Sequence, residues 1–132
     1  MIFNPEVECM AHEQMRELQS GHLSRTIQRV YDKVELYRHK MDAAGLKPAD
    51  IQSIDDLSKL PFTLKTDLRD TYPFGMFTEP LKNVVRIHSS SGTTGKPTVV
   101  GYTRNDVQSI FAEVCARSIG CASPVDPAHW QR

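Results

Sequence analysis

The chain has 132 residues, about the size of one ordinary domain, and 39% of them are hydrophobic. Its 16 basic residues balance its 16 acidic residues, so a nucleic-acid-binding face is not expected and nothing attracts the chain to an anionic membrane. No apolar run approaches the ~20 residues of a membrane-spanning helix, so we expect no membrane partner.

The first part of the chain is predicted to be helical. A helical pattern runs over Met10–Ala44, with an expected interruption at Ser20-Gly21, and Gly45 is a plausible terminator. Apolar residues recur at spacings of three and four, which places them on one face. These residues are Leu23, Ile27, Val30, Tyr31, Val34 and Tyr37.

Two short helices are expected next. Ser53 is the predicted cap of a helix over Ile54–Lys59, and Pro61 stops it. Thr63 is the predicted cap of a second helix that ends at Asp70, because its hydroxyl can accept a hydrogen bond from the first turn.

The pattern then changes to strand–loop–strand–helix. Residues 83–88 and 98–102 are rich in β-branched side chains, which favours two strands. Thr103, with Asp106 three residues later, resembles a capping box that opens a helix extending to Ile119. The expected fold class is α/β, with an α+β arrangement within these residues.

The residue types in the loop between the two strands indicate a specific chemistry. Gly92 and Gly95 permit backbone angles that let consecutive N–H groups converge on an anion. Lys96 adds a positive charge, and five hydroxyls add hydrogen-bond donors. The hydroxyl residues are Ser89, Ser90, Ser91, Thr93 and Thr94. This combination suits a polyphosphate.

The loop is not a Walker A loop. Ser90 stands where that motif has its first glycine, Pro97 stands where it has Ser or Thr, and a strand rather than a helix follows. The contribution of a helix dipole is therefore not expected. From composition alone, a flexible linker or hairpin turn is an open alternative.

The segment Ser90–Pro97 resembles the phosphate-binding motif of the adenylate-forming superfamily. The continuation Thr98–Thr103 and the upstream segment Leu60–Gly75 resemble its phenylacetate-CoA ligase branch. Thr98 stands where many members of the superfamily have Lys, which removes one phosphate contact. The resemblance identifies residues 1–120 as the N-terminal portion of an AMP-binding domain, followed by an irregular, disordered or non-native tail over residues 121–132.

The resemblance implies a two-step reaction. An aryl carboxylic acid, phenylacetate for this branch, reacts with ATP and Mg2+ to give an acyl-adenylate, and CoA then displaces AMP. The implied phosphate-binding residues are Ser90, Ser91, Gly92, Thr93, Thr94, Gly95 and Lys96. No catalytic residue and no metal ligand is expected in these 132 residues.

Other candidate contacts are weaker, and a structural role is favoured for each. They are Lys65 and Arg69 on a short helix, His88 before the loop, and the aromatic residues Tyr72, Phe74 and Phe77. Three cysteines without CxxC spacing indicate free thiols, and five scattered histidines predict no metal site. The first ten residues lack the features of a signal peptide, so a cytoplasmic protein is expected.

A complete ligase of this kind is several times longer, so the chain is expected to be an N-terminal fragment that is inactive alone. Two predicted strands leave open edges, which favours self-association or a homodimer. The alternative is a standalone module that binds nucleotide phosphates or a protein partner without catalysis.

Overall fold

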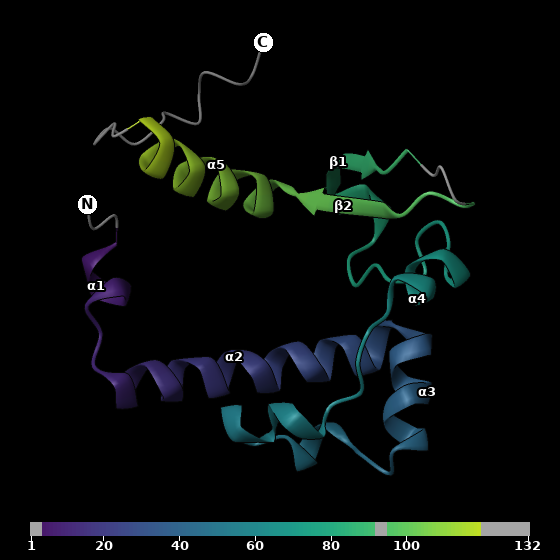
Figure 1. Cartoon of the computed structure of the whole chain (residues 1–132), viewed down its shortest axis with the longest axis horizontal. Helices are drawn as coiled ribbons and strands as arrows, with labels where there is room; N and C mark the ends of the chain where they lie inside the picture. The colour runs from purple at the N-terminus through teal and green to yellow at the C-terminus, as the bar shows by residue number, and fades with distance from the viewer. Residues whose placement is uncertain (1–3, 92–94, 120–132) are drawn as a thin grey trace.

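The chain folds into a helical region followed by a β-hairpin and a long helix (Figure 1). The structure, a computed structural model, describes residues 4–91 and 95–119, without the side chains of 111–113 and 115–119. The elements are α1 (Pro5–Glu8), α2 (His12–Lys33), α3 (Glu35–Ala43), η1 (Pro48–Asp50), η2 (Ile54–Lys59), α4 (Lys65–Asp70), η3 (Leu81–Asn83), β1 (Val84–Ser89), β2 (Val99–Thr103) and α5 (Arg104–Ile119), where η marks a 3-10 helix. This mixture of helices and a small antiparallel sheet confirms the predicted fold class.

The predicted interruption of the first helix at Ser20-Gly21 is wrong, because α2 runs through both residues. The Ser20 hydroxyl donates to the Arg16 carbonyl one turn earlier and accepts from the backbone N–H of Ile54. Tertiary contact therefore outweighs the weak helix propensity of this pair, for which an exposed glycine costs only about 1 kcal/mol.

The helix ends instead at Lys33, and the next residue, Val34, is buried and has an extended backbone. The Arg38 guanidinium donates to the carbonyls of Tyr31 and Asp32, at 2.9 and 2.7 Å, and so satisfies two of the last carbonyls of α2. The chain then turns into α3, which crosses the end of α2 (Figure 1).

A small apolar core lies where α2, α3 and the segment after η1 meet. Ile27, Met41 and Ile51 are buried, and Met41 is completely inaccessible to solvent. The half-buried residues around them are Leu23, Val30, Tyr31, Tyr37, Leu46 and Leu60. The predicted apolar face of the first helix is thereby confirmed, and Gly45 ends α3 with a φ of +70° as expected.

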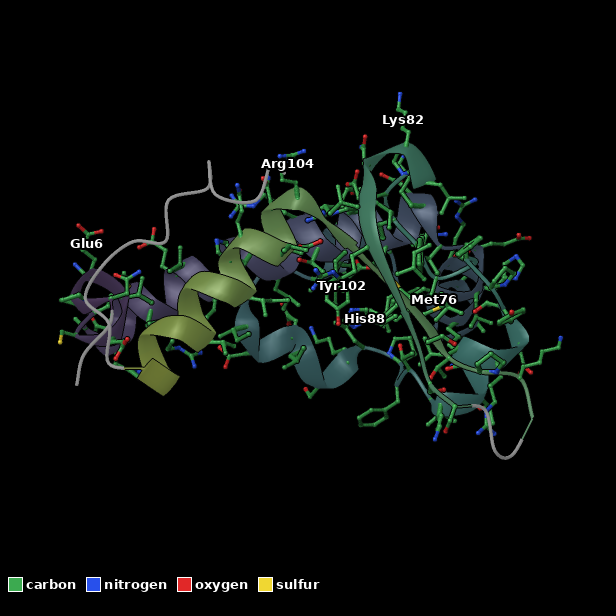
Figure 2. The ribbon with its side chains drawn as sticks, turned by 90° about the horizontal axis from the view of Figure 1, so that it is seen from above. Glu6, Met76, Lys82, His88, Tyr102 and Arg104 are labelled. Atoms are coloured by element: carbon green, nitrogen blue, oxygen red, sulfur yellow. The ribbon has the colours of Figure 1, made fainter. Side chains whose placement is uncertain are left out.

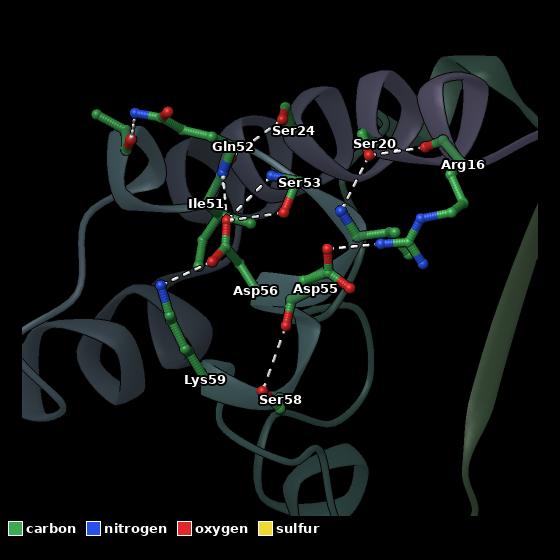
Figure 3. A network of polar contacts seen from close by, with 12 residues as sticks. Arg16, Ser20, Ser24, Ile51, Gln52, Ser53, Asp55, Asp56, Ser58 and Lys59 are labelled. Carbon is green, nitrogen blue, oxygen red and sulfur yellow. Dashed lines mark hydrogen bonds and ion pairs between the residues drawn. The ribbon is translucent and has the colours of Figure 1, made fainter. Parts of the chain in front are cut away.

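Polar contacts attach η2 to the side of α2 (Figure 3). Ser24 donates to the carbonyl of Ile51, and Arg16 forms an ion pair with Asp55. Asp56 accepts hydrogen bonds from the backbone N–H groups of Gln52 and Ser53, so this carboxylate completes the start of η2.

Helix α4 is held by a buried carboxylate rather than by the predicted cap Thr63. The cap position is Leu64, whose backbone N–H donates to Asp67 at 2.6 Å. Lys40 of α3 donates to Asp67 and to the carbonyl of Phe62. Asp67 therefore connects α4 to the helical region, whereas Thr63 is exposed.

The hairpin pairs β1 and β2 antiparallel, with Ser89 opposite Val99 at the loop end. The two strands lie within one residue of the predicted ranges. At the other end, Thr103 and Asp106 form the predicted capping box, in which Asp106 accepts from the Thr103 N–H and hydroxyl, both at 2.8 Å. This box turns the chain directly from β2 into α5.

Helix α5 packs against β2, and two of its apolar side chains stay exposed. Val107 is half-buried, but Ile110 and Val114 are 46% and 54% exposed. The predicted tail over residues 121–132 lies outside the described residues.

Candidate functional site

The predicted phosphate loop connects the two strands at the far end of the hairpin from α5. Ser90, Ser91, Gly95 and Lys96 are described, and all four are exposed. The other predicted contact residues, Gly92, Thr93 and Thr94, lie outside the described residues.

The two arms of the loop meet at Ser90 and Thr98. The Ser90 N–H donates to the Thr98 carbonyl at 3.0 Å. In return, the Thr98 N–H and the Thr98 hydroxyl donate to the Ser90 hydroxyl oxygen at 3.0 and 2.9 Å. We name this pair of residues the Ser90–Thr98 clasp.

The descending arm of the loop has the backbone freedom that the sequence predicts. Gly95 has a φ of +127°, which residues with a side chain rarely adopt, so glycine is required at this point. The exposed Lys96 follows it, and its ammonium group can therefore approach an anion in solvent. The described part of the loop offers an anion exposed donors, one cation and a backbone shaped by glycine.

The hairpin that carries the loop is fixed from one side by an aromatic residue. The ring of Phe77 packs onto Gly101 of β2 so closely that a β-carbon there would lie 2.5 Å from the ring. Phe74 supports Phe77, with ring centroids 5.2 Å apart. Both aromatic residues thus act in packing, as the sequence favoured.

His88 lies on β1 just before the loop, beside Tyr102 (Figure 2). The two rings make an edge-to-face contact with centroids 5.1 Å apart. This contact gives His88 a structural partner on the neighbouring strand. Lys65 and Tyr72 are exposed, and Arg69 is half-buried on α4.

A separate groove of about 830 Å3 lies between α2, the hairpin and the first turn of α5. Arg29, Lys82 and Arg104 line it together with Asp106. Hydrogen bonds from Thr103, reinforced by the charge of Arg29, hold the pKa of the Asp106 carboxyl below its ordinary value. No described residue of the loop lines this groove, so it is distinct from the candidate phosphate site.

Among the described side chains, no three His, Cys, Asp or Glu residues are grouped as a metal site would need. No helix in the described part of the chain is long and apolar enough to span a membrane.

Two residues that matter for the site were not predicted as such. Thr98 was seen only as the replacement of a lysine, although its position next to the loop is a signal for a role in closing it. Gly101 carried no signal, because only the fold brings Phe77 against it.

The sequence of the chain is similar to those of known ligases. The chain is 52% identical over 122 residues to a phenylacetate-coenzyme A ligase of Thermus thermophilus, and 49% identical over 125 residues to one of Escherichia coli K12. These alignments cover 92% and 93% of this chain. The chain is homologous to part of the phenylacetate-CoA ligases. It spans about a quarter of their length, 27% and 28% of these two relatives.

The structure of this phenylacetate-CoA ligase homologue also matches solved structures of a CoA ligase. A 2-hydroxyisobutyryl-CoA ligase in complex with 2-HIB-AMP and CoA matches with a TM-score of 0.76 and 31% identity, over 87% of this chain and 25% of that chain. The fold is thus that of the N-terminal part of an adenylate-forming CoA ligase. No protein-family model matches the chain.

Proposed function

We propose that this chain supplies the phosphate-binding loop of a phenylacetate-CoA ligase, which converts an aryl acid, ATP and CoA to acyl-CoA, AMP and pyrophosphate. The bound phosphates are those that leave as pyrophosphate when the acid attacks the α-phosphorus. The loop residues that hold them are Ser90, Ser91, Gly92, Thr93, Thr94, Gly95 and Lys96. Residues 1–120 form this portion of the AMP-binding domain.

The observation that carries the proposal is the position of the loop. The paired residues of β1 and β2 end at Ser89 and Val99, so the strands present the loop beyond their last pair. Negative charge develops on the pyrophosphate as it leaves, and prepositioned donors and a cation stabilise such charge. Lys96 provides the cation, while hydroxyl and amide groups fix the orientation.

The remaining chemistry requires residues beyond these 132. Mg2+ accompanies ATP in the proposed reaction, and CoA and the aryl acid are co-substrates. The 132 residues hold phosphates but complete no turnover by themselves. The proposed setting is the cytoplasm.

The binding part of the proposal is tested by isothermal titration of the chain with Mg-ATP. A dissociation constant below about 1 mM, equivalent to ~4 kcal/mol, is expected. Lys96→Ala should weaken binding about tenfold, because an ion pair with phosphate is lost. Lys82→Ala is the matched control: this lysine is also exposed but lies on η3, just before β1 and at the other end of the hairpin from the loop (Figure 2). Equal loss in both variants, or no binding by the wild type, refutes a specific site.

The catalytic part is tested by pyrophosphate release from phenylacetate, ATP and Mg2+. No release above the uncatalysed rate is expected from the 132-residue chain. Measurable release of pyrophosphate would show that these residues are sufficient for adenylation.

A second candidate function is an interaction module, which the exposed apolar surface of the hairpin favours. Val85, Ile87 and Val100 are 55%, 51% and 45% exposed. Such side chains on strands with open edges promote pairing with another copy. Light scattering checks this: concentration-dependent dimers or larger species are expected, and a monomer at all concentrations contradicts it.

A further inference from the structure

Thr98 interacts with Ser90 in a way that a regular hairpin does not require. In a regular antiparallel sheet, two residues that form a hydrogen-bonded pair each donate a backbone N–H to the carbonyl of the other. Here the Ser90 N–H bonds the Thr98 carbonyl as usual, but the Thr98 N–H is directed to the Ser90 hydroxyl instead of the Ser90 carbonyl. The Ser90 hydroxyl therefore replaces the Ser90 carbonyl as the acceptor of the last hydrogen bond between the two strands.

The Ser90 hydroxyl then has one hydrogen-bonding capacity left. A serine hydroxyl has two acceptor lone pairs and one proton. The Thr98 N–H occupies one lone pair at 3.0 Å, and the two hydroxyl oxygens lie 2.9 Å apart, so the Thr98 hydroxyl can donate to the other lone pair. In that arrangement only the proton of Ser90 remains, and a phosphate oxygen is an acceptor that can take it.

We propose that Thr98 is a positioning residue of the phosphate loop, which holds the Ser90 hydroxyl as an obligate hydrogen-bond donor to the polyphosphate. This inference rests on the proposed function for its ligand. Thr98 itself touches no phosphate and acts through Ser90. The position therefore contributes to binding without the lysine charge that many members of the superfamily have there.

The orientation of Thr98 suits this role. Its side chain is half-buried beside β2, and a β-branched residue has few rotamers, so its hydroxyl stays aimed at Ser90. Ser90 by contrast is exposed at the base of the loop. Without the two bonds from Thr98, its hydroxyl would rotate freely and bond water in several directions.

The first experiment is a double-variant cycle, with inorganic tripolyphosphate and Mg2+ as the titrated ligand. Ser90→Ala should weaken binding about tenfold, the lower limit for one hydrogen bond to a charged group, and Thr98→Val about threefold to tenfold, the range of an ordinary hydrogen bond. Thr98→Ser keeps the hydroxyl and should stay within about twofold of the wild type. In the Ser90→Ala background, Thr98→Val should cause no further loss, because its effect passes through Ser90.

The matched control is Thr63→Val, the same substitution at an exposed position in the linker before α4. It should leave tripolyphosphate binding unchanged. An independent loss from Thr98→Val when Ser90 is already Ala, or an equal loss from Thr63→Val, overturns the inference.

The second experiment measures amide hydrogen exchange by NMR in the free chain, and it needs no ligand. The Thr98 amide should be protected in the wild type, and Ser90→Ala should accelerate its exchange because the acceptor is removed. A protected amide with no tripolyphosphate binding would refute the proposed function and, with it, the role of Thr98. Binding together with an unprotected Thr98 amide would refute the clasp alone.

Discussion

A single added methyl group at Gly101 tests whether the hairpin is fixed as described. A β-carbon at this position would lie 2.5 and 2.7 Å from two ring carbons of Phe77 and 3.2 Å from a methyl group of Val84. Contacts under about 3 Å are not tolerated, so the ring must move away from the strand and from Phe74. Overpacking of this kind costs about 1–3 kcal/mol. We expect Gly101→Ala to destabilise the chain by that amount.

The assay is urea unfolding followed by circular dichroism, with Gly21→Ala as the matched control. Gly21 lies inside α2 with open space around its position, so the same substitution should stabilise the chain by about 0.5–1 kcal/mol. In a Phe77→Ala background, Gly101→Ala should cost little, because the clash is gone. A Gly101→Ala variant as stable as the wild type would refute the close packing of Phe77 on β2.

The remaining predictions concern the core, a buried carboxylate and the loop. Met41→Ala removes a fully buried side chain and should cost about 2–5 kcal/mol in thermal or urea unfolding. Hydrogen bonds from Lys40 and Leu64 hold the pKa of Asp67 below its ordinary value. The unfolded chain therefore binds more protons, so the stability from Asp67 is present above its unfolded pKa and is lost as pH falls through its folded pKa. Asp67→Asn should reduce this loss of unfolding free energy at low pH, in unfolding measured from pH 2 to 7. Lys96→Ala should weaken Mg-ATP binding and leave the unfolding free energy unchanged within about 0.5 kcal/mol, because this side chain is exposed.

Elements with local signals were predictable from the sequence. The capping box of Thr103 and Asp106 needs only residues three apart, and the structure confirms it. The strands were found because β-branched residues cluster there, and Gly45 marked the end of α3. The prediction of a break at Ser20-Gly21 was wrong because the decisive contact to Ser20 comes from Ile54, 34 residues away. Residue spacing within one segment contains no such information.

For the candidate site, the sequence indicated which chemical groups the loop contains but not which of them bond to each other. The composition of the loop showed hydroxyls, glycines and a lysine, which was enough to predict an anion site. It could not show that the Ser90 hydroxyl bonds both the backbone N–H and the hydroxyl of Thr98, since this depends on the register of the two strands. The cap of α4 was also misassigned to Thr63: the cap position is Leu64, whose backbone N–H donates to the carboxylate of Asp67.

The distribution of buried side chains separates the loop from the main source of stability. Among the described residues, the buried hydrophobic side chains lie between Ile27 and Ile51, in the helical region. The hairpin depends on its hydrogen-bond ladder, the Phe77 ring and the Ser90–Thr98 clasp. Local opening of a segment with little apolar burial requires less free energy than global unfolding. Substitutions in the loop should therefore change phosphate binding before they change global stability. A bound polyphosphate stabilises the folded state by RT ln(1 + [L]/Kd), so its effect should appear first as slower amide exchange in β1 and β2.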